Sequence, residues 1–327
     1  MLVQRIATAL FTIIVSLTIA FFLVRSMPGD IIYSLAADKA SSEGIPFDVA
    51  VEEVKGLYGL VEDQPLHKQY FTYISHLCKG DLGISVQYRV PVSKIIVTAL
   101  PWTIFVCSVS LLFSFALGTL LGMLTAWKRR TFLDPLVSAY ASITDATPDY
   151  LTALVLLVIF AVNLKWFPLR GAYSVDQTPG FNLAFIVDVL RHAALPILAY
   201  TIESLGGWAL IMKSNAVHVL GEDFVTAARA RGLPDQRIVV SYVGRNALLP
   251  SVTGLAIAFG GMLGGSTLIE SVFAYPGIGF FFAKAVALRD YPLIQGLLLL
   301  TVGGIIGANF LADILYALLD PRVRRQR

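Results

Sequence analysis

Long, nearly uncharged apolar stretches constrain this chain more than any other feature. Six of them lie at about 6–24, 98–126, 136–162, 193–212, 251–272 and 292–316. A helix that crosses the hydrocarbon core of a bilayer needs about 20 consecutive apolar residues, and lipid offers no partners to an unsatisfied backbone. With 56% hydrophobic and 14% charged residues, a soluble domain could not bury so much apolar surface. We therefore predict an all-α integral membrane protein with about six transmembrane helices.

The distribution of basic residues predicts the orientation of these helices. With the N-terminus inside, the cytoplasmic segments carry 13 Lys and Arg in 64 residues, and the two shorter outer loops carry 5 in 49. This excess agrees with the positive-inside rule and places both termini in the cytoplasm. No small-residue cleavage site follows the first stretch, so we interpret it as a retained span and not as a secretory signal. The net charge of +3 is too small to indicate nucleic-acid binding.

The predicted organisation is one transmembrane domain over residues 1–327. Residues 1–24 form the first span and residues 25–97 an extracytoplasmic segment, in which scattered aromatic residues favour short helices over the outer face. Residues 98–327 form a five-span core that contains a cytoplasmic loop at 213–250.

Proline and glycine positions predict local features of the spans. Pro101 suits the first turn of the second span, and Pro148 and Pro196 lie inside or near the starts of the third and fourth spans, where membranes tolerate kinks. Glycines four residues apart allow helices to approach closely. Such pairs occur at Gly118/Gly122, Gly260/Gly264, Gly261/Gly265 and Gly303/Gly307.

The inner loop at 213–250 reads as two short helices. Acidic residues open the first helix, at 222–231, and arginines close it, as the helix dipole favours. Gly232 can take the left-handed position after the helix, and Pro234 prevents its continuation. The second helix is expected from about 234 to 242. The apolar side of this hairpin must be buried, either under the protein's own spans or against a soluble partner.

The same loop resembles a known family. Residues 222–233, together with 245–250, closely resemble the "EAA" loop of ABC importer permeases, in the form found in the B-type subunit of dipeptide, oligopeptide and nickel systems. The first position of the pattern is Thr226 and not Glu, as is usual in that subfamily. Further motifs of the family follow the same order along nearly the whole chain, at residues 57–70, 79–92, 270–279 and 319–324.

The resemblance implies a type I ABC importer permease in a prokaryotic cytoplasmic (inner) membrane. Two similar permeases would form the pathway, two cytoplasmic ATPases would bind ATP and Mg and drive it, and an extracytoplasmic solute-binding protein would deliver the solute. Short peptides are the expected solute, with oligosaccharides or a nickel chelate as alternatives. The implied ATPase-coupling residues are Glu222, Asp223, Phe224, Thr226, Ala227, Ala228, Arg229, Arg231, Gly232 and Pro250.

The sequence lacks the motifs of catalysis or cofactor binding. It contains no Gly-Lys dipeptide and hence no phosphate-binding loop with its lysine. It has no His-Glu-x-x-His or Cys-x-x-Cys motif, and its four histidines are scattered. We therefore expect no catalytic residue, metal site or cofactor in this chain.

Glu203 is the charge expected deepest in the membrane. A carboxylate at that depth costs a few kcal/mol, about 2.5–3.5 on insertion scales for Asp, so it should face a partner or a wet cavity. It either contacts the second permease or lines the pathway. An ion-coupled secondary transporter is the remaining alternative, although such proteins carry more ionisable residues near the midplane or paired broken helices.

Overall fold

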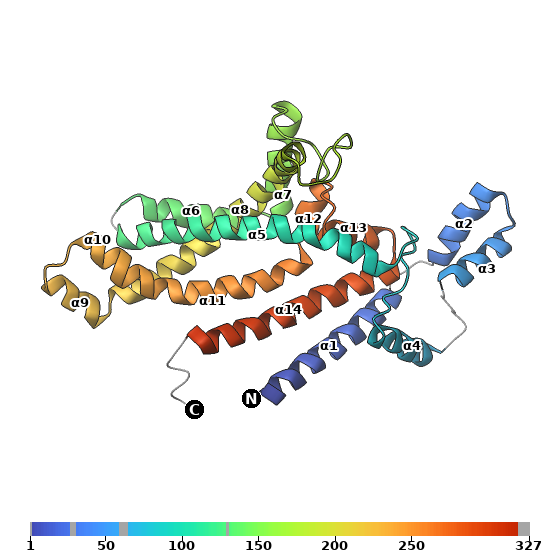
Figure 1. Cartoon of the computed structure of the whole chain (residues 1–327), viewed down its shortest axis with the longest axis horizontal. Helices are drawn as coiled ribbons and strands as arrows, with labels where there is room; N and C mark the ends of the chain where they lie inside the picture. The colour runs from blue at the N-terminus through green and yellow to red at the C-terminus, as the bar shows by residue number, and fades with distance from the viewer. Residues whose placement is uncertain (1, 27–30, 59–64, 129–130, 320–327) are drawn as a thin grey trace. The chain divides into compact units, whose positions relative to one another are not determined.

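The computed structural model describes residues 2–26, 31–58, 65–128 and 131–319 (Figure 1). Three groups of expectations lie outside the described residues: parts of the outer motif (59, 60 and 64), Arg129 and Arg130 of the inner basic segment, and the C-terminal residues 320–327. The described chain is helical, as predicted, with an isolated antiparallel bridge between Ile84 and Pro91. It divides into two compact units, Met1–Leu100 with Phe281–Gly303, and Pro101–Phe280 with Gly304–Arg327.

Among the described residues, two helices are individually long and apolar enough to cross a membrane. They are α5 (Val92–Trp127) and α8 (Leu183–Leu220). A third span is obtained if α6 (Leu133–Ala146) is joined to α7 (Asp149–Leu156) and the π-helical segment η1 (Leu157–Asn163), across a bend of 100°. Thr147, the residue before Pro148, is extended (φ −93°, ψ 124°), because proline disfavours a helical conformation in the residue before it.

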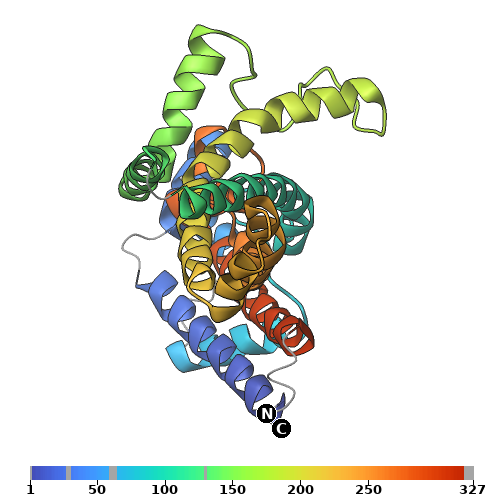
Figure 2. The ribbon, with the colours of Figure 1, turned by 90° about the vertical axis from the view of Figure 1, so that its left-hand side faces the viewer.

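Figure 2 shows the consequence of this bend within the second unit. The segment of α7 and η1 and the first part of α8 leave the axis of the bundle on diverging courses. The chain bends at Pro148, whereas Pro196 lies inside the continuous helix α8. Pro101, by contrast, was wrongly placed in a first turn: α5 begins at Val92, so this proline lies inside the helix.

The apolar stretch at 251–272 is not one helix, which corrects the sequence prediction. The helix α11 (Arg245–Gly261) ends in a short 3-10 turn, η3 (Met262–Gly264), and Gly265 adopts a left-handed conformation with φ +62°. A new helix, α12 (Thr267–Val272), then begins, and the Ser266 hydroxyl caps it by accepting the Ile269 N–H at 3.3 Å. Glycine-rich sequence weakens the helix here, because glycine loses the most conformational entropy on ordering.

One glycine pair brings two helices of the second unit close together. A Cβ on Gly118 of α5 would lie 2.7 Å from both the Leu205 carbonyl oxygen and the Trp208 Cβ of α8. A Cβ on Gly122 would overlap the carbonyl oxygen of Ala209. The close approach predicted from this spacing is confirmed. Gly261, Gly303 and Gly307 have no such neighbour within 4 Å.

The first unit contains short helices between residues 25 and 97, as expected. They are α2 (Ile31–Glu43), α3 (Phe47–Tyr58) and α4 (Leu66–Cys78), which follow α1 (Leu2–Arg25). Tyr70 of α4 packs edge-to-face against Phe21 of α1 with ring centroids 5.3 Å apart and shares a 2.7 Å hydrogen bond with Thr18. The helices α13 (Ile278–Ala287) and α14 (Tyr291–Leu319) complete the element order.

A buried carboxylate joins the loop at 81–91 of this unit to the start of α14. Asp290 is fully buried and accepts hydrogen bonds from the Ser85 hydroxyl at 2.5 Å and the Gln87 N–H at 3.0 Å. Its other oxygen accepts the Leu293 N–H at 3.2 Å, the bond of a helix N-cap. The loop at 81–91 is therefore held at the first turn of α14.

Candidate functional site

The helix α9 (Asp223–Ala230) forms the core of the predicted inner hairpin. It begins after the extended Glu222, and at eight residues it is about 12 Å long. Gly232 takes φ +70° and donates its N–H to Arg229 at 2.9 Å, while the Leu233 N–H bonds to the Ala228 carbonyl at 3.3 Å. These two bonds form a Schellman motif, so the expected role of Gly232 in ending the helix is confirmed.

The inner face of α9 packs against the protein's own helices. Val225 is 0% exposed and Ala228 is 3% exposed. Both belong to a buried cluster with residues from α5, α8 and the helix that follows, namely Ala126, Met212, Ala216, Ile238, Val243 and Ala247. Ala228 therefore cannot form part of an exposed docking surface, because its methyl group fills this cluster. Ala227 and Ala228 are adjacent and identical in type, so the sequence could not show that only Ala228 faces the core.

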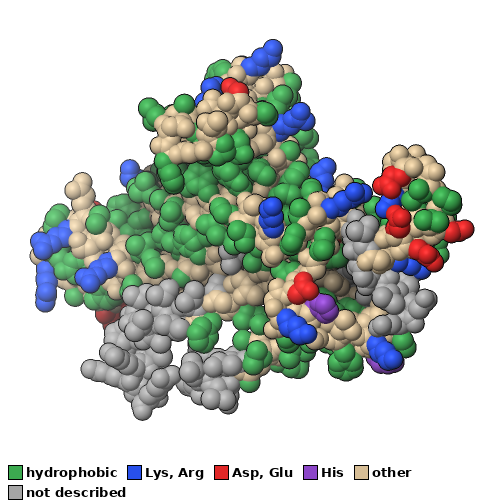
Figure 3. All heavy atoms as spheres, turned by 45° about the vertical axis from the view of Figure 1, so that its right-hand side comes forward, with side chains coloured by type: hydrophobic (Ala, Val, Ile, Leu, Met, Phe, Trp, Pro, Cys, Tyr) green, Lys and Arg blue, Asp and Glu red, His purple; other side chains and the backbone are tan. Residues whose placement is uncertain are grey.

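The outer face of α9 carries most of the other predicted coupling residues. Phe224 keeps 40% of its surface exposed. The rest of the exposed group is Glu222, Asp223, Thr226, Ala227, Arg229, Arg231 and Gly232. Basic side chains gather over α9 and α10 (Asp235–Arg237) (Figure 3). This face combines an aromatic side chain with acidic and basic groups, as protein-docking surfaces often do.

The second inner helix starts where expected and then continues further. Pro234 precedes α10, and the π-helical segment η2 (Ile238–Gly244) leads directly into α11. Pro250 is exposed and lies inside α11. The hairpin is thus joined without a flexible linker to the next long apolar helix.

Glu203 lies half-buried in α8 within a group of polar side chains. It accepts a hydrogen bond from Thr152 of α7 at 2.5 Å. One turn earlier in α7, Asp149 accepts from the Ser266 hydroxyl at 2.8 Å, and the Ser266 N–H donates to the Tyr200 hydroxyl at 2.5 Å. Within the part of the chain that the structure describes, neither carboxylate has an ion pair with a basic residue. Sequence reasoning missed Ser266, because it was assigned to a continuous helix.

A second carboxylate, Glu270, is fully buried at the end of the broken helix. It accepts hydrogen bonds from the Thr103 hydroxyl at 2.9 Å and the Phe280 N–H at 3.1 Å. Gly277 packs directly against this group, and a Cβ at this position would collide with Glu270 and Thr103. The sequence signal was the motif at 270–279, but its role as a buried anchor for the following turn was not predicted.

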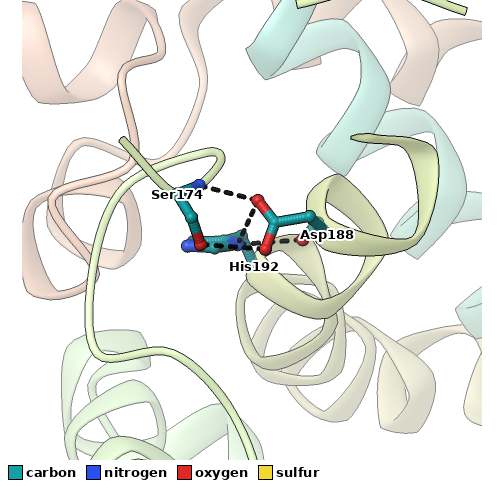
Figure 4. Close-up of polar contacts among 3 residues, drawn as sticks. All are labelled: Ser174, Asp188 and His192. Atoms are coloured by element: carbon teal, nitrogen blue, oxygen red, sulfur yellow. Dashed lines mark hydrogen bonds and ion pairs between the residues drawn. The ribbon is translucent and has the colours of Figure 1, made fainter. Parts of the chain in front are cut away.

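A serine, an aspartate and a histidine meet near the N-terminal end of α8, without the geometry of a catalytic triad. Asp188 accepts from the Ser174 hydroxyl at 2.9 Å and the Ser174 N–H at 2.6 Å (Figure 4). The His192 Nδ1 lies 2.8 Å from the Asp188 carbonyl oxygen. In a Ser-His-Asp triad the serine hydroxyl bonds to the imidazole, whereas this hydroxyl donates to the carboxylate. The contact fixes the preceding loop onto α8. Among the described residues, no group of three or more His, Cys, Asp and Glu could hold a metal ion.

Comparison with known proteins gives a consistent result. Residues 118–325 match the family model described as "Binding-protein-dependent transport system inner membrane component". The chain is 32% identical over 322 residues to the di/tripeptide transport system permease protein DppB of Pseudomonas aeruginosa, with 94% of each chain covered. It is 34% identical to the oligopeptide transport system permease protein OppB of Haemophilus influenzae, with 98% of each covered.

A third relative and a solved structure extend this comparison. The glutathione transport system permease protein GsiC of Salmonella typhimurium is 32% identical, with 98% of this chain and 97% of the relative covered. The inward-facing MetNI methionine ABC transporter has a chain that superposes with a TM-score of 0.52 at 18% identity, covering 70% of this chain and 97% of that one. At that identity, the likeness shows the fold alone.

Proposed function

Because the chain belongs to the family of binding-protein-dependent transport system inner membrane components, we propose that it forms half of a peptide pathway and is driven through α9. The permease itself is a non-catalytic inner-membrane subunit of an ABC importer and holds no cofactor. ATP hydrolysis belongs to separate ATPase subunits, and an extracytoplasmic binding protein supplies the solute.

The two-faced packing of α9 is the observation that carries this proposal. Its outer residues are free to enter a groove of an ATPase, and its inner residues Val225 and Ala228 are fixed to α5, α8 and α11. A displacement of the ATPase would move α9 as a rigid body, and the buried cluster would pass that motion to the long helices. Coupling of this kind needs an element with two arrangements that both ATP and solute can bias.

The proposed assembly places two similar permeases side by side in the membrane. Six spans in a single transmembrane domain, with both termini in the cytoplasm and a type I importer fold, are supported by the apolar character of α1, α5, α6 with α7, α8, α11 and α14. The breaks after α6 and α11 suit such a role, because irregular backbone at membrane depth must be buried in protein or line a cavity.

Short peptides are the proposed solute. The relatives are named for the transport of di/tripeptides, oligopeptides and glutathione, and these three kinds of solute share a peptide backbone. The polar group around Glu203 is the candidate pathway lining, since a half-exposed carboxylate without a basic partner among the described residues favours water or a polar solute over lipid. A contact with the second permease is the alternative role for this residue.

Reconstitution tests the proposed function. The chain would be purified with its second permease and two ATPases, placed in lipid, and assayed for ATP hydrolysis with peptide-loaded binding protein. Stimulation by a peptide mixture is the expected result. Stimulation only by oligosaccharides or a nickel chelate would replace the solute, and failure to associate with any ATPase would contradict the role of α9.

Glu203→Gln separates the two roles of that carboxylate. We expect peptide uptake to fall about threefold, through a higher half-saturating concentration of loaded binding protein or peptide, because one charge of the polar group is lost. The assembly of the complex, followed by size-exclusion chromatography, should be unchanged. Weakened assembly with normal uptake per complex would assign Glu203 to the contact between permeases.

A further inference from the structure

We propose that the exposed face of the α2–α3 hairpin is the surface on which the extracytoplasmic binding protein docks. The proposal rests on the proposed function, in which such a protein delivers peptides. Tyr33 of α2 and Phe47 of α3 stack with ring centroids 6.0 Å apart, yet 49% and 41% of their surfaces are exposed. Beside them, Val49 is 44% exposed. Paired aromatic residues that remain exposed are typical anchors of protein interfaces.

The hairpin is formed before any partner arrives. Ala36, Ala50 and Val54 make a small core between the two helices, and Val86 from the outer loop and Tyr291 from α14 pack against it. Lys39 of α2 reaches across to Glu53 of α3 at 2.5 Å. Binding to such a rigid surface costs little ordering entropy, which is an advantage for a contact that must form and break in every cycle.

The charge around the aromatic pair indicates the chemistry of the partner. Residues 31–58 contain five acidic and two basic residues. Lys39 lies near both Glu43 and Glu53, while Asp48 and Glu52 are exposed. Acidic side chains gather over the hairpin in Figure 3. The complementary surface is an apolar recess bordered by Lys and Arg, and attraction between such surfaces speeds their encounter.

The same charge argues against two other occupants. A bilayer surface that contains anionic lipid would repel the exposed carboxylates, and a second copy of this hairpin would bring like charges together. The helix α4 provides a contrast within the same outer segment. Its Phe71 is 69% exposed, but α4 (Leu66–Cys78) contains Lys68 and no acidic residue. The acidic rim is therefore a property of the hairpin and not of the whole segment.

The contact between the α2–α3 hairpin and the loop at 81–91 could transmit the effect of docking to α14. Val86, which contacts the core of the hairpin, lies between Ser85 and Gln87, the two residues that bond to Asp290. A tilt of the hairpin would act directly on the loop that is fastened to the first turn of α14. Docking can thus bias the position of a long helix without any new contact at depth.

The test uses the complete importer in lipid nanodiscs and candidate peptide-binding proteins of the same organism, each loaded with a mixture of short peptides. The concentration of binding protein that half-maximally stimulates ATP hydrolysis is compared between the wild type, the double variant Tyr33→Ala/Phe47→Ala, and Phe71→Ala as a matched control. We expect an increase of about tenfold for the double variant, with the rate at saturation unchanged, and no increase for Phe71→Ala.

Glu52→Lys provides a second variant that leaves the aromatic pair and the small core intact. It should raise the half-stimulating concentration about threefold at low salt and less at high salt, because exposed charges are screened. Thermal melting and basal ATP hydrolysis check that each variant is folded. If the hairpin variants match the wild type, or if the increase appears only in anionic nanodiscs, the docking surface is refuted. If no loaded binding protein stimulates the wild type, the proposed function fails instead.

Discussion

The two helical hairpins, α9–α10 and α2–α3, differ in how they are attached to the rest of the protein. In α9, the buried face contacts residues from α5, α8 and the helix after it, so the hairpin moves with several long helices. In α2–α3, most of the buried core lies between the two helices themselves, with Val86 and Tyr291 as the additional contacts. A hairpin that transmits force needs many buried contacts with the rest of the protein. A hairpin that is only recognised needs exposed residues that a partner can bind.

The two hairpins also differ in the sign of the charges that they expose. Basic side chains gather over α9 and α10, and acidic side chains gather over α2–α3 (Figure 3). Charge on an exposed rim affects the rate and specificity of association more than the final affinity. The comparison therefore predicts that variants of the buried residues and the C-terminal cap of α9 affect folding and coupling. Changes in the first unit should instead affect local order and docking.

The largest effect is expected from Val225→Asp, which places a charge in the buried face of α9. An unpaired charge in an apolar cluster costs on the order of several kcal/mol, so the hairpin should detach from α5 and α8. The neighbouring, exposed Thr226→Asp adds the same charge to the outer face and serves as the control. Melting of the purified chain should fall markedly for Val225→Asp only; equal melting of the two variants would contradict the two-faced packing.

Gly232→Val should uncouple hydrolysis from transport. Valine in the left-handed conformation that Gly232 adopts, φ +70°, is strained by about 1–2 kcal/mol, which would distort the end of α9. We expect peptide uptake to fall about tenfold while the complex still assembles. Gly232→Asn is the matched control, because Asn tolerates this conformation and should retain most uptake. Similar uptake by both variants would show that the end of α9 is not a coupling element.

Asp290→Ala should loosen the outer loop at 81–91. The change leaves the Ser85 hydroxyl and the Gln87 and Leu293 N–H groups without their acceptor, at a cost of about 1–3 kcal/mol. Hydrogen exchange of residues 83–91 should become faster. In Asp290→Asn, which keeps one carbonyl oxygen, the effect should be smaller. Unchanged exchange in both variants would remove Asp290 as the link between this loop and α14.

The smallest effect concerns pH and Asp81, which is exposed. The His76 Nδ1 at 2.8 Å and then the Gly83 N–H at 2.9 Å hold the pKa of Asp81 below its ordinary value. A lowered folded-state pKa means that the stabilisation of this turn is complete above the unfolded-state pKa and is lost as pH falls through the folded-state pKa. A nitroxide on the exposed Cys78 should become more mobile below about pH 4. The Asp81→Asn variant should lose this dependence; if it does not, another group is responsible.

Some features of the fold could be read locally. The left-handed Gly232, the stop at Pro234 and the kink at Pro148 depend on residues that are adjacent in sequence, so they were predicted correctly. Pro101 was misplaced because the helix that contains it starts earlier, with Val92. The break after Gly261 was missed because an apolar composition is compatible with both a straight helix and an interrupted one.

The amino-acid sequence by itself determined that this protein is helical, that it belongs in a membrane, and that a helix capped at its C-terminus lies near residues 222–232. These properties follow from apolar runs, charge distribution and capping residues, which act over a few turns. Only the tertiary structure decided that Ala228 faces inward, and that Ser266 meets both Asp149 and Tyr200. Such contacts depend on how distant helices pack, and packing follows from shape and close approach across the fold, as at Gly118 and Gly122.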